Sequence, residues 1–163
     1  MGAFDRQLRI QNWDQGKIEN SVCLILGVGG IGTGVAMGLA RLGVKKLILV
    51  DKDVVDISNL NRQILFSPQH VGKPKVDVAA EMLKTYHLIN PATEIETYHF
   101  DVLPNWPTIV KLVVKEATVV FNNIDVGEYY DAAVMSLCIH AKKLLICGGN
   151  FAQQFCVDSV KPG

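Results

Sequence analysis

The stretch Gly27-Val28-Gly29-Gly30-Ile31-Gly32 constrains the fold of this chain more than any other part of its sequence. It follows a continuous apolar run, Val22–Leu26, and opens a series of apolar residues at helical spacing that ends at Leu42. A buried parallel strand that turns through glycines into a helix is typical of nucleotide-binding α/β folds, because glycines let backbone N–H groups approach a phosphate and the helix N-terminus favours an anion. The alternative is a glycine-rich turn that serves only the packing of helix on strand.

An acidic residue at the end of the next apolar run supports the nucleotide interpretation. Leu47–Val50 predicts a second buried strand, and Asp51 follows it 24 positions after Gly27. A carboxylate at this distance accepts hydrogen bonds from ribose hydroxyls in dinucleotide-binding folds. The two features together predict a bound nucleotide and leave NAD, FAD and ATP open.

Short apolar runs alternate with longer helical ones along the rest of the chain, whose 163 residues suit one domain. This alternation predicts a doubly wound, Rossmann-like α/β fold, with a mostly parallel sheet and helices on both faces. A polar N-terminal arm, residues 1–20, precedes the pattern. Further strands are expected at 94–100, 118–121 and 144–147, an edge strand at 151–160, helices at 31–42, 75–89, 108–115 and 128–141, and a polar loop at 52–74.

The composition narrows the class of protein. Hydrophobic residues make up 49% of the chain and charged residues 20%, so a packed core is expected rather than disorder. The 16 basic and 16 acidic residues give a formal net charge of zero, which favours neither nucleic acid nor an anionic membrane as a partner. The apolar runs are too short to span a bilayer, and no signal-peptide core follows Met1. We therefore expect a cytoplasmic protein.

The cysteines also indicate the cytoplasm, which is a reducing compartment. Cys23, Cys138 and Cys147 lie in apolar runs and form no C-x-x-C pair, so they are interpreted as buried thiols. Cys156 is interpreted as structural rather than catalytic. A structural zinc site needs about four Cys or His ligands at suitable spacing, and we expect none within this chain.

The loop after Asp51 is rich in cationic and amide side chains. A triphosphate requires Arg and Lys in fixed positions to neutralise its charge, whereas a dehydrogenase usually has no such need after its second strand. Lys75, in the first turn of its expected helix, could reach phosphates near the glycine loop. The alternative is an ordinary solvated loop. The polar residues are Asp53, Asp56, Asn59, Asn61, Arg62, Gln63, Lys73 and Lys75.

Three motifs resemble a known family. Residues 51–63, Asp-Lys-Asp-Val-Val-Asp-Ile-Ser-Asn-Leu-Asn-Arg-Gln, followed by Val-Gly-Lys-Pro-Lys at 71–75, look like the adenylation domain of ubiquitin-activating enzymes and their bacterial relatives ThiF and MoeB. The glycine loop matches the family's G-x-G-G-x-G, and Phe4–Ile10 is similar to its aromatic-x-R-Q opening. The resemblance runs from about Phe4 to Gly163, so residues 1–163 are expected to form a single ATP-binding adenylation domain.

The resemblance implies a role for each matching residue. The backbone of Gly30 would lie against the nucleotide, Asp51 would bind the ribose, and Asp125 would bind Mg²⁺. Arg6 resembles the arginine that reaches into the active site of the partner subunit. The implied catalytic set is Arg6, Arg62, Lys75 and Asp125, and the implied nucleotide-binding set is Gly27, Gly29, Gly30, Gly32, Asp51, Asn59, Arg62, Gln63 and Lys75.

The implied activity is adenylation of the C-terminal carboxylate of a ubiquitin-like or sulfur-carrier protein by ATP with Mg²⁺, releasing pyrophosphate. The motifs around Arg6 and Arg62 are divided between two different halves in the family's heterodimers. Because both occur in this chain, we expect a homodimer in which Arg6 completes the other subunit's site.

The sequence departs from the family in two places. The family's D-N-x-x-x-R pattern is absent after Asp125, although Asn122 or Asn123 could supply the missing amide. The chain also stops at Gly163, before the zinc site and thioester-forming cysteine of many members, so we expect either an early end or a piece of a longer enzyme. Two other functions stay open: a catalytically silent half that binds a partner, and an oxidoreductase that uses NAD or FAD.

Overall fold

A six-stranded sheet forms the centre of the molecule, with the strand order β3-β2-β1-β4-β5-β6. The computed structural model describes residues 2–151 and 154–160, with side chains described for residues 2–148, 159 and 160. All neighbouring strands are parallel except β5 and β6. The strands are β1 Val22–Leu26, β2 Lys46–Asp51, β3 Glu94–His99, β4 Val119–Asn122, β5 Leu144–Phe151 and β6 Gln154–Val160.

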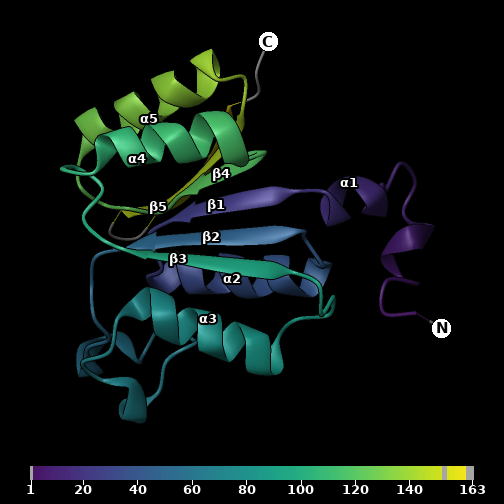
Figure 1. Ribbon diagram of the computed structural model, residues 1–163, viewed down its shortest axis with the longest axis horizontal. Coiled ribbons are helices and arrows are strands. Elements are labelled where there is room, and N and C mark those ends of the chain that lie inside the picture. The colour runs from purple at the N-terminus through teal and green to yellow at the C-terminus, as the bar shows by residue number, and fades with distance from the viewer. Residues whose placement is uncertain (1, 152–153, 161–163) are drawn as a thin grey trace.

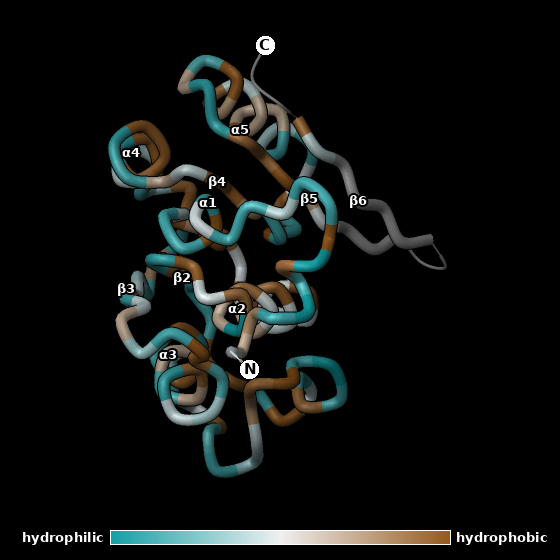
Figure 2. The backbone as a smooth tube through the Cα atoms, turned by 90° about the vertical axis from the view of Figure 1, so that its right-hand side faces the viewer, coloured by the Kyte–Doolittle hydropathy of each residue, from teal (hydrophilic) through white to brown (hydrophobic). Residues whose placement is uncertain are grey.

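Helices cover both faces of this sheet (Figures 1 and 2). α2 (Gly30–Leu42) and α3 (Lys75–Tyr86) pack on one face, and α4 (Trp106–Lys111) and α5 (Glu128–His140) on the other. The alternation of side chains along β1 serves both layers, since Ile25 belongs to the first core and Leu24 to the second. The predicted doubly wound α/β fold is therefore confirmed. The shorter elements are η1 Gln7–Arg9, α1 Gln15–Glu19, η2 Ile57–Asn59, η3 Pro68–His70 and the π-helical turn η4 Leu112–Glu116.

Some boundaries differ from the expected ones. α3 ends at Tyr86 rather than at residue 89, because the N–H groups of His87 and Leu88 both bond to the Leu83 carbonyl and close the last turn. β5 continues past the expected end at residue 147, because Gly148 pairs with β6 instead of forming a turn. β6 is the expected edge strand and begins at Gln154.

The chain reverses direction across the sheet between β1 and β4, and this places the candidate site. These two strands are neighbours, and Leu26 pairs with Asn122 at their carboxyl ends. The connection after β1 enters α2 on one face, whereas that after β4 leads to α5 on the other face. Loops that diverge in this way leave a crevice at the carboxyl edge of the sheet, where α/β proteins bind ligands. Among the described residues, no helix combines the length and apolarity needed to cross a membrane.

Candidate active site

Two adjoining cavities occupy this carboxyl edge. The larger, of about 870 Å³, lies between the glycine loop, the loop around Arg62 and the residues that follow β4. The smaller, of about 250 Å³, extends from the glycine loop past Asp51 to Val102. The cavities share Gly29, Asp53, Lys75, Asn123, Ile124 and Asp125, so they form one site with two compartments.

The glycines of the loop divide into two that serve packing and two that face the larger cavity. Gly27 has φ +87°, and a Cβ added there would lie 2.9 Å from the Asn123 carbonyl oxygen. A Cβ on Gly32 would lie 2.0 Å from the Gly27 carbonyl oxygen, and Gly32 lines neither cavity. Gly29 and Gly30 line the larger cavity, and the nearest atoms to their added Cβ positions belong to side chains of the Arg62 loop. Packing therefore explains Gly32 and the conformation of Gly27, which also lines the smaller cavity, whereas Gly29 and Gly30 lie at the larger cavity, where side-chain rather than backbone atoms are nearest to their added Cβ positions.

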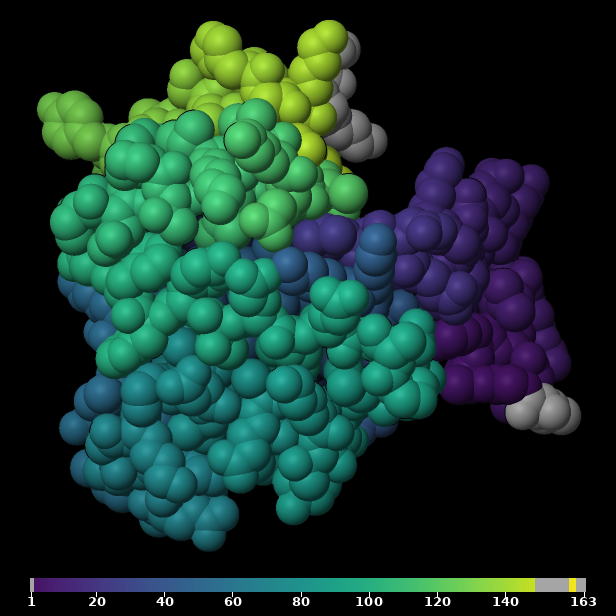
Figure 3. Space-filling model, viewed as in Figure 1, coloured from purple at the N-terminus to yellow at the C-terminus, as the bar shows by residue number. Residues whose placement is uncertain are grey.

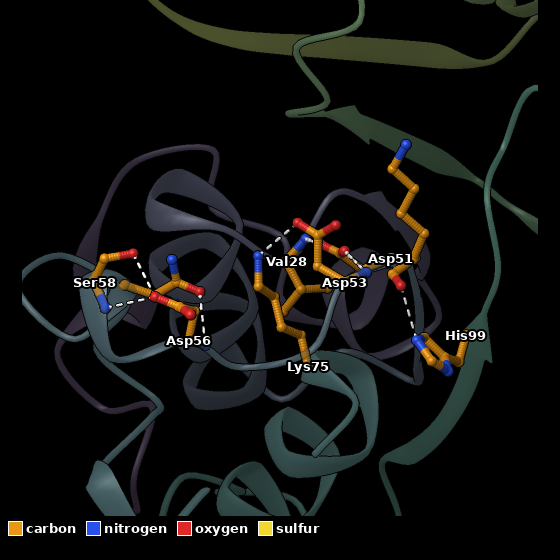
Figure 4. A network of polar contacts seen from close by, with 9 residues as sticks. Val28, Asp51, Asp53, Asp56, Ser58, Lys75 and His99 are labelled. Atoms are coloured by element: carbon orange, nitrogen blue, oxygen red, sulfur yellow. Dashed lines mark hydrogen bonds and ion pairs between the residues drawn. The ribbon is translucent and has the colours of Figure 1, made fainter. Parts of the chain in front are cut away.

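Asp51, at the end of β2, forms hydrogen bonds with the glycine loop and with the loop that follows β2 (Figure 4). Its Oδ2 accepts the Val28 N–H at 2.7 Å, and its Oδ1 accepts the Asp53 N–H at 2.8 Å. The carboxylate is buried and lines the smaller cavity. Each oxygen keeps a second lone pair, so the expected bonds to ribose hydroxyls are compatible with these contacts.

A short capped turn presents the cationic side of the larger cavity. Asp56 accepts the Ser58 N–H, and Asn59 Oδ1 accepts the Asp56 N–H, which fixes η2. Arg62 is exposed, its Nη1 donates to the Ser58 carbonyl at 3.0 Å, and its side chain passes over Gly30. Lys75 opens α3 and is buried, with its Nζ 2.8 Å from Asp53 Oδ2. Two positive charges, one exposed and one buried, thus border the glycine loop.

Several polar atoms in the wall of the larger cavity have no protein partner. Gln63 and Asn122 are each only 3% exposed. Among the described residues that line this cavity, the buried side-chain atoms without a hydrogen-bond partner are Gln63 Oε1, Asn122 Oδ1 and Asn123 Nδ2. A buried polar group without a partner costs about 1–3 kcal/mol. Such groups in a cavity wall indicate that a ligand or water completes their bonding. Of the two asparagines, Asn123 is the one with a free amide donor, because Asn122 Nδ2 already donates to Asp131 Oδ1 at 2.8 Å.

Asp125 lies on the segment that joins β4 to α5. Its side chain is exposed and lines both cavities. The described residues contain no group of three or more His, Cys, Asp or Glu arranged to hold a metal. Mg²⁺ needs fewer protein ligands, since one or two carboxylates together with substrate phosphates and waters commonly complete its coordination shell. The position of Asp125 therefore fits the Mg²⁺ role that the resemblance implies, which stays a prediction.

The structure brings together every candidate site residue except Arg6 and Gly32. Phe4 packs at the far end of α2, where its Cζ would lie 2.8 Å from a Cβ on Gly43, and Gln15 Nε2 donates to the Leu42 carbonyl. The exposed Arg6 belongs to this arm, which projects from one end of the molecule (Figure 3). With 13 residues, α2 is about 20 Å long. Arg6 and the glycine loop therefore lie at opposite ends of this helix.

Asp53 and Asp131 line the larger cavity but are not among the site residues predicted from the sequence. In the sequence, Asp53 is one polar residue of the loop among several, and its pairing with Lys75 joins positions 22 apart. Asp131 lies on α5 and lines the larger cavity beside Asn122. The spacing of Asp53 two residues after Asp51 was an available signal, whereas no sequence motif pointed to Asp131.

The thiols far from the cavities match their interpretation as buried groups. Burial raises the pKa of Cys23 to about 12 and that of Cys138 to about 11, so neither forms a thiolate near neutral pH. The interpretation of Cys147 as a buried thiol is wrong, because this residue at the carboxyl end of the parallel sheet is half-buried and lines the larger cavity. Cys156 lies outside the described side chains.

Comparison of this chain with known proteins finds a matching protein family and several similar proteins. A family model described as the ThiF family matches residues 4–156. Ubiquitin-like modifier-activating enzyme 5 of Drosophila pseudoobscura pseudoobscura is 34% identical over 125 residues, which cover 76% of this chain and 30% of that protein. The tRNA threonylcarbamoyladenosine dehydratase of Bacillus subtilis is 46% identical over 78 residues, which cover 48% of this chain and 30% of that protein.

The fold also matches solved structures. The crystal structure of E. coli MccB with ATP superposes with a TM-score of 0.82 at 29% identity, covering 91% of this chain and 43% of that chain. The structure of PaaA superposes with a TM-score of 0.75 at 29% identity and covers 88% of this chain and 45% of that chain. The chain thus spans less than half the length of each of these relatives.

Proposed function

Because this chain belongs to the ThiF family, we propose that it binds ATP in the two-compartment cavity and adenylates the C-terminal carboxylate of another protein or peptide. The observation that carries the proposal is the arrangement around the glycine loop, where Lys75, Arg62 and Asp125 all line the larger cavity. The partnerless atoms of Gln63 and Asn123 add hydrogen-bonding capacity that only a ligand or water can use. An ATP complex of the similar MccB supports ATP as the nucleotide.

The proposed reaction depends on alignment and charge stabilisation. A carboxylate oxygen of the substrate attacks the α-phosphorus of ATP, the bond from that phosphorus to the bridging oxygen breaks, and pyrophosphate leaves with the electron pair. Lys75 and Arg62 offset the negative charge on the phosphates, and backbone N–H groups of the glycine loop donate to them. No side-chain nucleophile is needed, which agrees with the buried positions of Cys23 and Cys138.

Mg²⁺ fits the donors present and, when bound, would neutralise part of the phosphate charge. Asp125 is the carboxylate that would hold it, at the carboxyl end of β4 where both cavities meet. Asp51 would orient the ribose from the smaller cavity, since its carboxylate is already fixed by two backbone donors.

The substrate that we propose is a ubiquitin-like or sulfur-carrier protein, acting in the cytoplasm. The names of the relatives support a modifier or peptide, since one is a ubiquitin-like modifier-activating enzyme and MccB has been solved with MccA. We also propose a homodimer in which Arg6 enters the partner's cavity. The position of the arm at the far end of α2 supports a role outside its own site.

A silent partner-binding half is the second candidate function, and two positions favour it. Val126 and Tyr130 stand where the family pattern D-N-x-x-x-R has asparagine and arginine. Tyr130 is buried, and burial raises the pKa of its hydroxyl, so it brings no charge to the phosphates. An oxidoreductase is disfavoured by the ThiF membership and by the cationic groups at the larger cavity.

Three measurements separate these functions. Calorimetry with ATP and Mg²⁺ tests nucleotide binding, and ATP–pyrophosphate exchange with a panel of ubiquitin-like and sulfur-carrier proteins tests adenylation. Exchange that depends on one of these proteins supports the proposed enzyme, whereas ATP binding without exchange supports the silent half. Stabilisation against heat by NAD(H) but not by ATP with Mg²⁺ would reverse the choice of nucleotide.

A further inference from the structure

The ion pair between Asp53 and Lys75 lies at the junction of the two compartments. Lys75 Nζ is 2.8 Å from Asp53 Oδ2, and both residues line both cavities (Figure 4). Among the ion pairs of the described residues, no other lines both cavities. A carboxylate therefore already neutralises the lysine that is proposed to bind phosphate.

The two partners differ sharply in exposure. The side chain of Lys75 is 6% exposed, whereas that of Asp53 is 54% exposed. A buried ammonium without a partner is costly, so Lys75 needs a negative group at all times. Asp53 has no such need, because its carboxylate can rotate into water and be solvated there.

The backbone of Asp53 is fixed while its side chain is not. The Asp53 N–H donates to Asp51 Oδ1 at 2.8 Å, and the Asp53 carbonyl accepts the Lys75 N–H at 3.0 Å. These bonds hold the start of α3 against the end of β2 on both sides of the ion pair. A rotation of the Asp53 side chain is therefore enough to break the pair, and no loop has to move.

We propose that Asp53 occupies the place of a phosphate on Lys75 and that the triphosphate of ATP displaces it. Without nucleotide, Asp53 positions Lys75 and neutralises it. In the complex, the phosphate takes over that contact and Asp53 turns to solvent, because two negative groups on one ammonium repel each other. This inference rests on the proposed ATP-binding function.

The exchange of partners has a measurable consequence for affinity. The free energy of the Asp53–Lys75 pair is lost each time a phosphate binds, so the pair weakens ATP binding. Removing the carboxylate should therefore strengthen ATP binding and, at the same time, destabilise the ligand-free protein. A residue that merely supported the fold would weaken binding when replaced.

The test compares Asp53→Asn with Asp56→Asn. Asp56 lies on the same loop, but its carboxylate bonds to Ser58 and not to Lys75. Asparagine can accept the same bonds, so Asp56→Asn keeps the η2 turn and removes a charge that lies near Lys75 without contacting it. The ligands are ATP with Mg²⁺ and AMP, titrated by calorimetry.

Asp53→Asn should bind ATP about fivefold more tightly than wild type. This factor matches the small free energy of an ion pair that has one exposed partner. Its ligand-free melting temperature should fall, and its AMP affinity should change little. The control should leave both affinities near wild type. Unchanged or weaker ATP binding by Asp53→Asn, or an equal gain in Asp56→Asn, would overturn the inference. Failure of the wild type to bind ATP would instead overturn the proposed function.

A second measurement needs no substitution and decides the question if Asp53→Asn does not fold. The ¹³C resonance of the Asp53 carboxyl carbon in the wild-type protein reports its contact with Lys75. Saturating ATP should move this resonance to the position of a solvated aspartate, whereas AMP should leave it in place. A resonance that does not move with saturating ATP shows that the pair persists and overturns the inference.

Discussion

At the scale of single residues, the cavity is built from charges held in place and amides left without partners. Lys75 is buried and paired, whereas Arg62 is exposed and leans over Gly30. Gln63 and Asn123 line the larger cavity, and each has one buried polar atom without a protein partner. In the proposed complex, the two cations would contact the phosphates and the two amides would supply hydrogen bonds to the ligand.

Lys75→Ala should weaken ATP binding by about 1.5–3 kcal/mol, because a charge-assisted contact to phosphate is lost. AMP binding should weaken less, since the distal phosphates are absent from that ligand. Calorimetry on both nucleotides measures the difference. Lys73→Ala is the matched control, because Lys73 is exposed on the same loop and lines neither cavity. An equal loss for ATP and AMP would contradict a phosphate role for Lys75.

Asp125→Ala should abolish ATP–pyrophosphate exchange and leave the melting temperature nearly unchanged, because the carboxylate is exposed and makes no packing contribution to the core. Glu128→Ala is the control, since Glu128 is an exposed acid in the first turn of α5 that lines neither cavity. Near-normal exchange in Asp125→Ala would move the metal role to another residue.

At the scale of secondary-structure elements, the junction between β1 and α2 depends on the absence of two side chains. Gly27 adopts φ +87° against the segment after β4, and Gly32 packs on the Gly27 carbonyl. Both contacts hold the loop close to β4, so that the amino end of α2 faces the cavity. The geometry of the loop is thus fixed by backbone packing rather than by ligand contacts.

Gly32→Ala should lower the free energy of unfolding by about 3 kcal/mol or more, because the added Cβ would lie 2.0 Å from a backbone oxygen. Gly34→Ala on the same helix should stabilise the protein by about 0.5–1 kcal/mol, since nothing lies within 4 Å of its added Cβ. Urea unfolding of both variants measures the contrast. Similar stabilities for the two would show that the loop can relax around the new methyl group.

The order of strands and helices could be predicted from the spacing of apolar residues. Buried parallel strands form unbroken apolar runs, whereas the helices between them repeat apolar residues at helical spacing. The extension of β5 through Gly148 could not, since glycines in a sequence indicate a turn and only the pairing with β6 makes a strand there. The π-helical turn at Leu112–Glu116 has no local signal either.

The candidate site could be predicted where its residues fall in contiguous motifs, as with Asp51, Arg62 and Lys75. The contacts that depend on packing between distant segments could not. Asn122 bonds to Asp131 only because the end of β4 meets α5, and the Asp53–Lys75 pair forms only because the loop returns to β2. The glycine motif also predicts Gly32 as a ligand contact, whereas in the structure Gly32 packs on the Gly27 carbonyl within the loop.

At the scale of the whole molecule, the N-terminal arm and the cavity are held apart by α2. The contacts of Phe4 with Gly43 and of Gln15 with Leu42 place the arm at the end of α2 that lies away from the glycine loop. A two-fold dimer is the commonest soluble assembly and would give each cavity one arm from its partner.

Mixing Arg6→Ala with Lys75→Ala protein should restore part of the wild-type pyrophosphate exchange, because a mixed dimer then contains one cavity with both cations. Each variant alone should be inactive. Light scattering and subunit exchange must show that mixed dimers form. A mixture that stays inactive although its subunits exchange would show that Arg6 does not act across the interface, and a monomer in solution would contradict the dimer.

The separation of Arg6 from the glycine loop along α2 also bears on how the rate depends on dilution. One copy cannot complete its own set of cations if its arginine lies at the other end of a helix that is about 20 Å long. In the proposed dimer, turnover per chain would then rise with protein concentration and level off above the dissociation constant of the dimer. The length of one helix would in this way make the abundance of the protein a control on its rate.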